Sequence, residues 1–144
     1  MLKVVSVLGF TGMAAGFLRL LAIHALFSPS VLVIASQVAA LALLLWARFT
    51  FGRRSFHAAA NPTEGGLVTR GPYRYIRHPI YTSLCVFVWA GIVAHWSSEA
   101  CLLGVWVVVS ALARIFAEEK LVSLRYPDYA DYSERTWRMI PYVF

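Results

Sequence analysis

The sequence is poor in charged side chains. Asp, Glu, Lys and Arg make up only 14% of the 144 residues, whereas 60% are hydrophobic and the mean hydropathy is +0.67. Soluble domains typically carry about 25% charged residues. The composition therefore excludes an ordinary soluble domain, and the length predicts a single domain over residues 1–144.

Cysteine is also scarce. Cys85 and Cys101 are the only two, and each lies in or beside an apolar stretch without CxxC spacing. His24, His57 and His95 lie in separate segments without metal-ligand spacing. We expect no metal site, and we expect the cysteines to serve as small buried apolar side chains.

Acidic residues are outnumbered by basic ones, which gives a net charge of +6. Residues 27–30 and 97–100 contain no Lys or Arg, whereas 48–77 and 120–138 hold most of them. The positive-inside rule then predicts that both termini face the cytoplasm, and we expect a bacterial or archaeal inner membrane. Attraction to anionic lipid accounts for the charge, so nucleic-acid binding is a poor interpretation.

Long hydrophobic runs fill much of the chain, at 4–27, 31–47, 81–96 and 101–113. A membrane-spanning helix needs about 20 apolar residues, so the last two runs reach full length only if their polar ends enter the headgroup layer. The first run exceeds the ~7 to 15 residues of a signal-peptide core and lacks a cleavage pattern. The sequence predicts an all-α integral membrane protein with four transmembrane helices in two antiparallel hairpins.

The connections suggest how the helices pair. Residues 28–30 are too few for anything except a tight hairpin between the first two helices. Gly9, Gly12 and Gly16 give the first helix a face that a neighbour can approach closely, which would allow a homodimer. Ser98 is the expected N-cap of the fourth helix.

The expected segments follow from these patterns. Residues 1–51 form the first hairpin, 52–80 a cytoplasmic loop with turn formers at 61–66, 81–119 the second hairpin, and 120–144 a cytoplasmic C-terminal segment. Within the last segment we expect a short interfacial helix broken near Pro127.

Residues 71–81, which read GPYRYIRHPIY, place many polar groups at the start of an apolar helix. His78 precedes Pro79 and should be extended, leaving backbone groups outside the helix that can bind a ligand. The alternative is that the arginines contact lipid phosphates and the tyrosines form an aromatic belt.

Arg114 and Glu118 are four residues apart, so they can pair on one helix face. A buried arginine in a membrane span is costly and should face protein or a water-filled cavity; the alternative is that it snorkels to the headgroups. Glu119 points ~100° away from Glu118. At most one of the two carboxylates can share a pocket with Arg114, and we favour Glu118.

These residues resemble a known superfamily. LVTRGPYRYIRHPIY at 67–81, then Arg114, Glu118 and Glu119, then YPDYADY at 126–132, are similar to the isoprenylcysteine carboxyl methyltransferase and phospholipid methyltransferase superfamily. The resemblance covers residues 64–144. It implies an integral membrane methyltransferase that uses S-adenosylmethionine, held at the cytoplasmic face beneath the C-terminal segment.

The resemblance also implies residue roles. Arg114 matches an arginine at the acceptor site, where it would be the catalytic residue. The cofactor-binding residues would be Leu67, Val68, Tyr73, His78, Pro79, Tyr81 and Glu118. The chain departs from the family pattern at Ser83, often glycine, and at Tyr126-Pro127, often Phe-Gly, which changes the expected shape of the C-terminal lid.

The acceptor is expected to be lipophilic and to enter sideways between helices. A carboxylate, as in a prenylcysteine-like or isoprenoid compound, needs only orientation, which Arg114 can supply. A phospholipid amine or a thiol would have to lose a proton to Glu118, Glu119 or a tyrosine. Two other classes are an NADPH-dependent sterol-type reductase, which commonly has Asn where Ile80 stands, and an inactive helical membrane protein.

Overall fold

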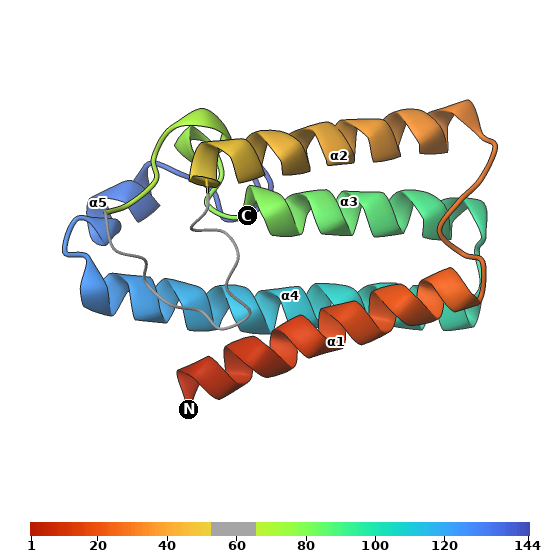
Figure 1. Cartoon of the computed structure of the whole chain (residues 1–144), viewed down its shortest axis with the longest axis horizontal. Helices are drawn as coiled ribbons and strands as arrows, with labels where there is room; N and C mark the ends of the chain where they lie inside the picture. The colour runs from red at the N-terminus through yellow and green to blue at the C-terminus, as the bar shows by residue number, and fades with distance from the viewer. Residues whose placement is uncertain (53–65) are drawn as a thin grey trace.

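The computed structural model describes residues 1–52 and 66–144, and its long elements are helices (Figure 1). The elements are α1 (Leu2–Ala22), α2 (Val31–Phe51), the 3₁₀ turn η2 (Gly71–Arg74), α3 (Pro79–Ala94), α4 (Ser98–Arg125) and α5 (Tyr129–Glu134). The predicted all-α fold is confirmed for this part of the chain. His57 and most of the expected turn at 61–66 lie outside the described residues.

Within the described residues, three helices are long and apolar enough to cross a bilayer. α1 and α2 have 21 residues each and α4 has 28, whereas the apolar α3 has 16. α4 is longer than its apolar run at 101–113 because no proline interrupts it before Pro127, so its polar end stays helical. It ends at Arg125, so residues 120–125, which we expected in the C-terminal segment, belong to α4, and the short helix α5 begins only after Pro127.

The helices pair differently from the sequence expectation. α1 lies along α4 and α2 lies along α3, while α1 and α2 have almost no mutual contact (Figure 1). The predicted tight hairpin between the first two helices is therefore wrong. α1 ends at Ala22, and residues 23–30 form a longer connector that lets the two helices separate.

The connector is held by buried contacts. His24 has a positive φ of 55°, and Ala25 and Leu26 are buried beside α3. The Gln37 amide donates a hydrogen bond to the Leu26 carbonyl at 2.6 Å. A Cβ at Gly91 would overlap the connector backbone, so glycine is required there.

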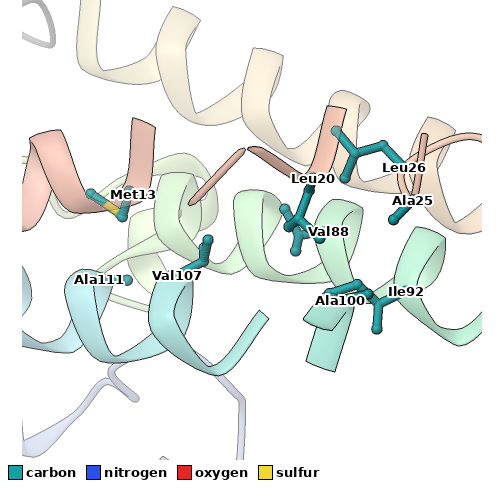
Figure 2. Packing of buried hydrophobic residues seen from close by; sticks show 9 residues of the cluster. All are labelled: Met13, Leu20, Ala25, Leu26, Val88, Ile92, Ala100, Val107 and Ala111. Atoms are coloured by element: carbon teal, nitrogen blue, oxygen red, sulfur yellow. The ribbon is translucent and has the colours of Figure 1, made fainter. Parts of the chain in front are cut away.

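The glycine face of α1 packs on α4. A Cβ added at Gly9 would lie 2.7 Å from the Ser110 carbonyl oxygen, and one at Gly16 would lie 2.7 Å from a Val107 methyl carbon. Buried apolar residues from α1, α3, α4 and the connector form one cluster along these helices (Figure 2). The predicted close approach is confirmed, and the neighbour on this face is α4 of the same chain.

Local signals set the ends of α3 and α4. Ser97, and not Ser98, caps α4: its side chain accepts the Ala100 N–H at 3.1 Å. Pro79 is the first residue of α3. The start of α1 and α3 and the end of α2 and α4 lie at one end of the bundle, which we call the site end, and residues 126–144 pack there.

Candidate active site

The turn before α3 is hydrogen-bonded to the C-terminal segment through the main chain of residues 75–78 and 137–138, and we call this connection the strap. His78 precedes the helix with φ −126° and ψ 54°, which is not the extended conformation expected from the sequence, and its N–H lies outside the helix. That N–H donates to the Arg138 carbonyl at 2.9 Å, and the Arg77 N–H donates to the Trp137 carbonyl at 2.7 Å. The expectation that backbone N–H groups here bind a ligand is wrong for these two, because the protein uses them itself.

Arg114, Tyr81 and Glu118 form a buried polar cluster. The Arg114 Nε donates to the Tyr81 hydroxyl at 2.5 Å and to Glu118 Oε1 at 2.9 Å. The Tyr81 hydroxyl donates to the same carboxylate oxygen at 2.6 Å. Arg114 is only 5% exposed, so the predicted pairing is confirmed and Arg114 does not snorkel.

Helix α1 completes this cluster. The Arg114 Nη1 donates to the Ser6 carbonyl at 3.1 Å, and the Arg114 Cζ lies 5.3 Å from the centre of the Phe10 ring. A cation at this distance from an aromatic face is attracted to it. Neither Ser6 nor Phe10 belongs to a motif, so sequence reasoning missed both.

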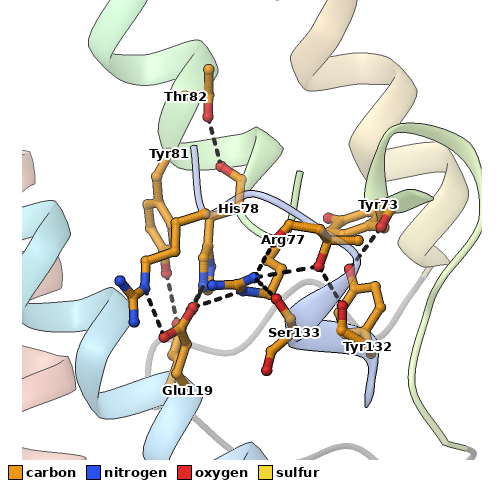
Figure 3. Close-up of polar contacts among 11 residues, drawn as sticks. Tyr73, Arg77, His78, Tyr81, Thr82, Glu119, Tyr132 and Ser133 are labelled. Carbon is orange, nitrogen blue, oxygen red and sulfur yellow. Dashed lines mark hydrogen bonds and ion pairs between the residues drawn. The ribbon is translucent and has the colours of Figure 1, made fainter. Parts of the chain in front are cut away.

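Glu119 binds a different set of partners (Figure 3). Its Oε1 accepts from Arg77 Nε at 2.9 Å and lies 3.3 Å from His78 Nε2, and its Oε2 accepts from Arg138 Nε at 3.0 Å. The His78 Nδ1 is 3.9 Å from Glu118 Oε2, so the imidazole lies between the two carboxylates. Of the two carboxylates, Glu118 is the one that pairs with Arg114. The prediction that at most one of them shares a pocket with Arg114 is wrong, because Glu119 lines the same cavity.

Arg77 ties the turn to α5 and the segment after it. Its Nη1 donates to the Ser133 carbonyl at 2.7 Å and also to the Thr136 carbonyl, and its side chain is only 9% exposed. The suggestion that it contacts lipid phosphate is therefore wrong, whereas Arg70 and Arg74 are exposed. Its position directly before His78 is the sequence signal for this role.

Tyrosines close the same region. The Tyr132 hydroxyl donates to the Tyr73 carbonyl at 2.7 Å and so joins α5 to η2. Burial raises the pKa of the Tyr73, Tyr129 and Tyr132 phenols above their usual value. All three stay neutral at physiological pH and line the cavity with hydroxyl groups that can form hydrogen bonds.

One cavity of about 700 Å³ joins these groups. The cavity is lined by all the residues predicted to be catalytic or to bind the cofactor, namely Leu67, Val68, Tyr73, His78, Pro79, Tyr81, Arg114 and Glu118. The structure thus brings together two motifs that are about 40 residues apart in the chain. The individual binding roles of these residues stay predictions.

The cavity continues as an apolar slot between α1 and α2. Phe17 of α1, Leu44 of α2 and Phe87 of α3 line this part. Leu18 and Leu41 also line it, yet they are 62% and 46% exposed. They form the rim of an opening toward the lipid, which exists because α1 and α2 do not pack together.

Fold and site together define a helical membrane protein whose polar centre opens into a lipid-facing slot. A family model described as phospholipid methyltransferase matches residues 30–129. The chain belongs to the phospholipid methyltransferase family, within the isoprenylcysteine carboxyl methyltransferase-like superfamily. The match begins after α1, so Ser6 and Phe10 lie outside it.

A curated relative is the nickel-cobalt-cadmium resistance protein NccN of Alcaligenes xylosoxydans xylosoxydans. It is 35% identical over 101 residues, which are 67% of this chain and 42% of the relative. The chain thus spans less than half of that protein. No solved structure matches the chain.

Proposed function

We propose that the protein transfers a methyl group from S-adenosylmethionine to a lipophilic acceptor at the site end of the bundle. The observation that supports this most is the single cavity, which joins the cluster of Arg114, Glu118 and His78 to an apolar slot open to lipid. A water-soluble cofactor and a membrane-dissolved acceptor can meet only in such a place. The acceptor class that we favour is a carboxylate, as in a prenylcysteine-like or isoprenoid compound.

The residues around the polar part of the cavity fit the cofactor. Its volume lies within the ~300–1,000 Å³ of small-molecule sites, which also combine apolar walls with a few placed polar groups. Leu67 and Val68 offer apolar contact, Tyr73 and Tyr81 offer aromatic faces, and the Glu118 carboxylate suits an ammonium or a ribose hydroxyl. When bound, S-adenosylmethionine supplies an electrophilic methyl group on its sulfonium.

The chain's own contribution is positioning. Contacts from Glu118, Tyr81 and Ser6 hold the Arg114 guanidinium in place, so the arginine offers a fixed cation beside the slot. A carboxylate acceptor is already ionised at pH 7 and needs only to be oriented toward the methyl group. The hydrogen bonds from Arg77 and His78 hold the C-terminal segment beside the polar part of the cavity.

The second candidate is methylation of a phospholipid amine, which the description of the family model favours. An ammonium group must first lose a proton, and Glu118 is the carboxylate beside Arg114 that would take it. Both Arg114 and Tyr81 donate hydrogen bonds to Glu118, so its carboxylate is already engaged within the cluster. A carboxylate acceptor needs no such base, and we therefore favour it.

The orientation follows from the same proposal. The site end carries the basic segments of the chain, and a cofactor made in the cytosol must reach the cavity there. We therefore place both termini in the cytoplasm. Cysteines introduced at Arg70 and at Ser28, labelled from either side of sealed vesicles, test this orientation.

The acceptor is identified by following the label. Membranes containing the wild-type protein or Glu118→Gln are incubated with methyl-labelled S-adenosylmethionine and extracted. We expect label from the wild type in a lipid-soluble ester that mild base hydrolyses, and much less from Glu118→Gln. Label that is stable to base and lies in a phospholipid headgroup would show that the acceptor is an amine and not a carboxylate. If no label is incorporated and no cofactor binds, the proposal is overturned.

A further inference from the structure

The last eight residues fold into a compact unit, which we call the C-terminal hook (residues 137–144). The Met139 and Ile140 N–H groups both donate to the main-chain oxygen of Phe144, at 2.7 and 2.8 Å. Tyr142 has a positive φ of 65°, and its ring lies 5.6 Å from that of Trp137. The hook is therefore an ordered part of the fold.

The hook contacts the outward face of α3. The Thr82 hydroxyl, in the first turn of the helix, donates to the Met139 carbonyl at 2.9 Å. Val86 follows one turn later on the same face and Val93 two turns after that, and they are 43% and 65% exposed. Within the described residues no helix covers this face, so in the membrane it meets lipid.

The hook also contacts the outward face of α4. The Arg138 guanidinium lies between the rings of Phe116 and Phe144, 5.2 Å from each ring centre. Phe116 is 49% exposed and continues a row with Val109 and Leu102, which are 53% and 71% exposed. The hook thus lies where the lipid-facing rows of two spans end, and none of its residues lines the cavity.

The outer surface of the hook is apolar and aromatic. Trp137, Ile140, Tyr142 and Val143 are 41%, 52%, 87% and 74% exposed. Tryptophan and tyrosine concentrate at the boundary between headgroups and acyl chains, where an apolar ring with one polar atom is best solvated. Arg138 beside them suits the phosphate layer.

We propose that the C-terminal hook inserts these four side chains into the headgroup region of the leaflet at the site end, and anchors the strap to the membrane. The surface is continuous with the lipid-facing rows of α3 and α4, which favours lipid over a second copy of the chain. The anchor matters for the site because Trp137 and Arg138 hold the backbone of Arg77 and His78.

The direct test measures the depth of Trp137. The full-length protein and Trp137→Phe are reconstituted in phosphatidylcholine vesicles whose acyl chains carry bromine either near the headgroup or near the terminal methyl. The fluorescence difference between the two proteins isolates Trp137. We expect it to be quenched at least twice as strongly by the shallow bromine as by the deep bromine, and hardly by aqueous acrylamide.

Two controls keep the test decisive. Trp46→Phe removes an exposed tryptophan of α2 and shows how a span residue responds to both lipids. Val143→Asp should at least halve the shallow quenching while circular dichroism stays unchanged. Quenching of Trp137 by acrylamide without quenching by either brominated lipid would overturn the proposal. It would also be overturned if the variant Val143→Cys formed a disulfide-linked dimer in which Trp137 is protected from bromine, because a second copy of the chain would then cover the hook.

Discussion

Glu118 and Glu119 are consecutive residues of α4, yet their carboxylates bind separate sets of partners. Glu118 accepts hydrogen bonds from Arg114 and Tyr81 inside the cavity, whereas Glu119 binds cations of the turn and of the C-terminal segment. The ~100° between neighbouring helix positions produces this division. Both carboxylates line the cavity, but Glu118 belongs to the Arg114 cluster, whereas Glu119 holds the turn before α3 and the C-terminal segment together.

Glu119→Gln should lower the stability of the protein strongly. The change leaves the nearly buried Arg77 without its counter-ion, and breaking a buried pair costs about 3–5 kcal/mol. The midpoint of thermal unfolding in detergent measures the loss. Glu99→Gln is the matched control, because Glu99 pairs with Arg19 while both side chains are more than half exposed, and such pairs are worth about 0–1 kcal/mol. Equal shifts in the two variants would contradict the role given to Glu119.

Tyr81→Phe should reduce methyl transfer while the fold is kept. The ring stays, but Arg114 and Glu118 lose the hydroxyl that bridges them. A hydrogen bond to a charged group is worth about 1.5–3 kcal/mol, so we expect kcat/KM to fall by roughly 10- to 100-fold. Tyr75→Phe is the control, since Tyr75 is 57% exposed and does not line the cavity. Unchanged kinetics in Tyr81→Phe would remove Tyr81 from the site.

Phe10→Leu should impair use of the acceptor more than binding of the cofactor. Leucine keeps an apolar side chain but loses the ring that faces Arg114, an interaction worth about 0.5–2 kcal/mol. We expect a several-fold higher KM for the acceptor, unchanged affinity for S-adenosylhomocysteine, and normal kinetics in Phe10→Tyr. Phe49→Leu, at an 82% exposed position of α2, is the control. Equal losses in the leucine and tyrosine variants would argue against an effect of the ring on Arg114.

Gly9→Val should separate α1 from α4. Even the first side-chain carbon would lie 2.7 Å from the Ser110 carbonyl and 2.9 Å from Arg114 Cβ, and overpacking costs about 1–3 kcal/mol. We expect a lower unfolding midpoint and weaker methyl transfer, because Arg114 also loses Ser6. Ala39→Val on the exposed face of α2 should change neither quantity. Wild-type behaviour of Gly9→Val would show that the helices do not approach as closely as described.

Much of the fold and of the candidate site was predictable from local patterns. The apolar runs predicted the helices because burying backbone in lipid leaves few alternatives to a helix. The i,i+4 spacing of Arg114 and Glu118 predicted their pairing. Their meeting with His78 followed from the resemblance, since no local rule brings together residues 36 or more positions apart.

Helix pairing was not predictable in the same way. Counting residues 28–30 as the connection assumed that the first helix lasts as long as its apolar run, whereas it ends at Ala22. Its end depends on the burial of Leu26 against α3, a tertiary contact without Pro or Gly to mark it. The contribution of Ser6 to the site was hidden for a related reason, because it comes from a main-chain carbonyl, which any residue type provides.

The central claim is that one cavity between the turn before α3 and the end of α4 binds the cofactor. Calorimetric titration of S-adenosylhomocysteine into the detergent-purified protein tests it most directly, with Glu118→Ala, His78→Ala and the exposed control Phe49→Leu in parallel. We expect saturable binding to the wild type and the control, and binding weakened at least tenfold in the other two variants. Absence of binding to the folded wild type at millimolar ligand, or equal affinity in all four proteins, would contradict the account.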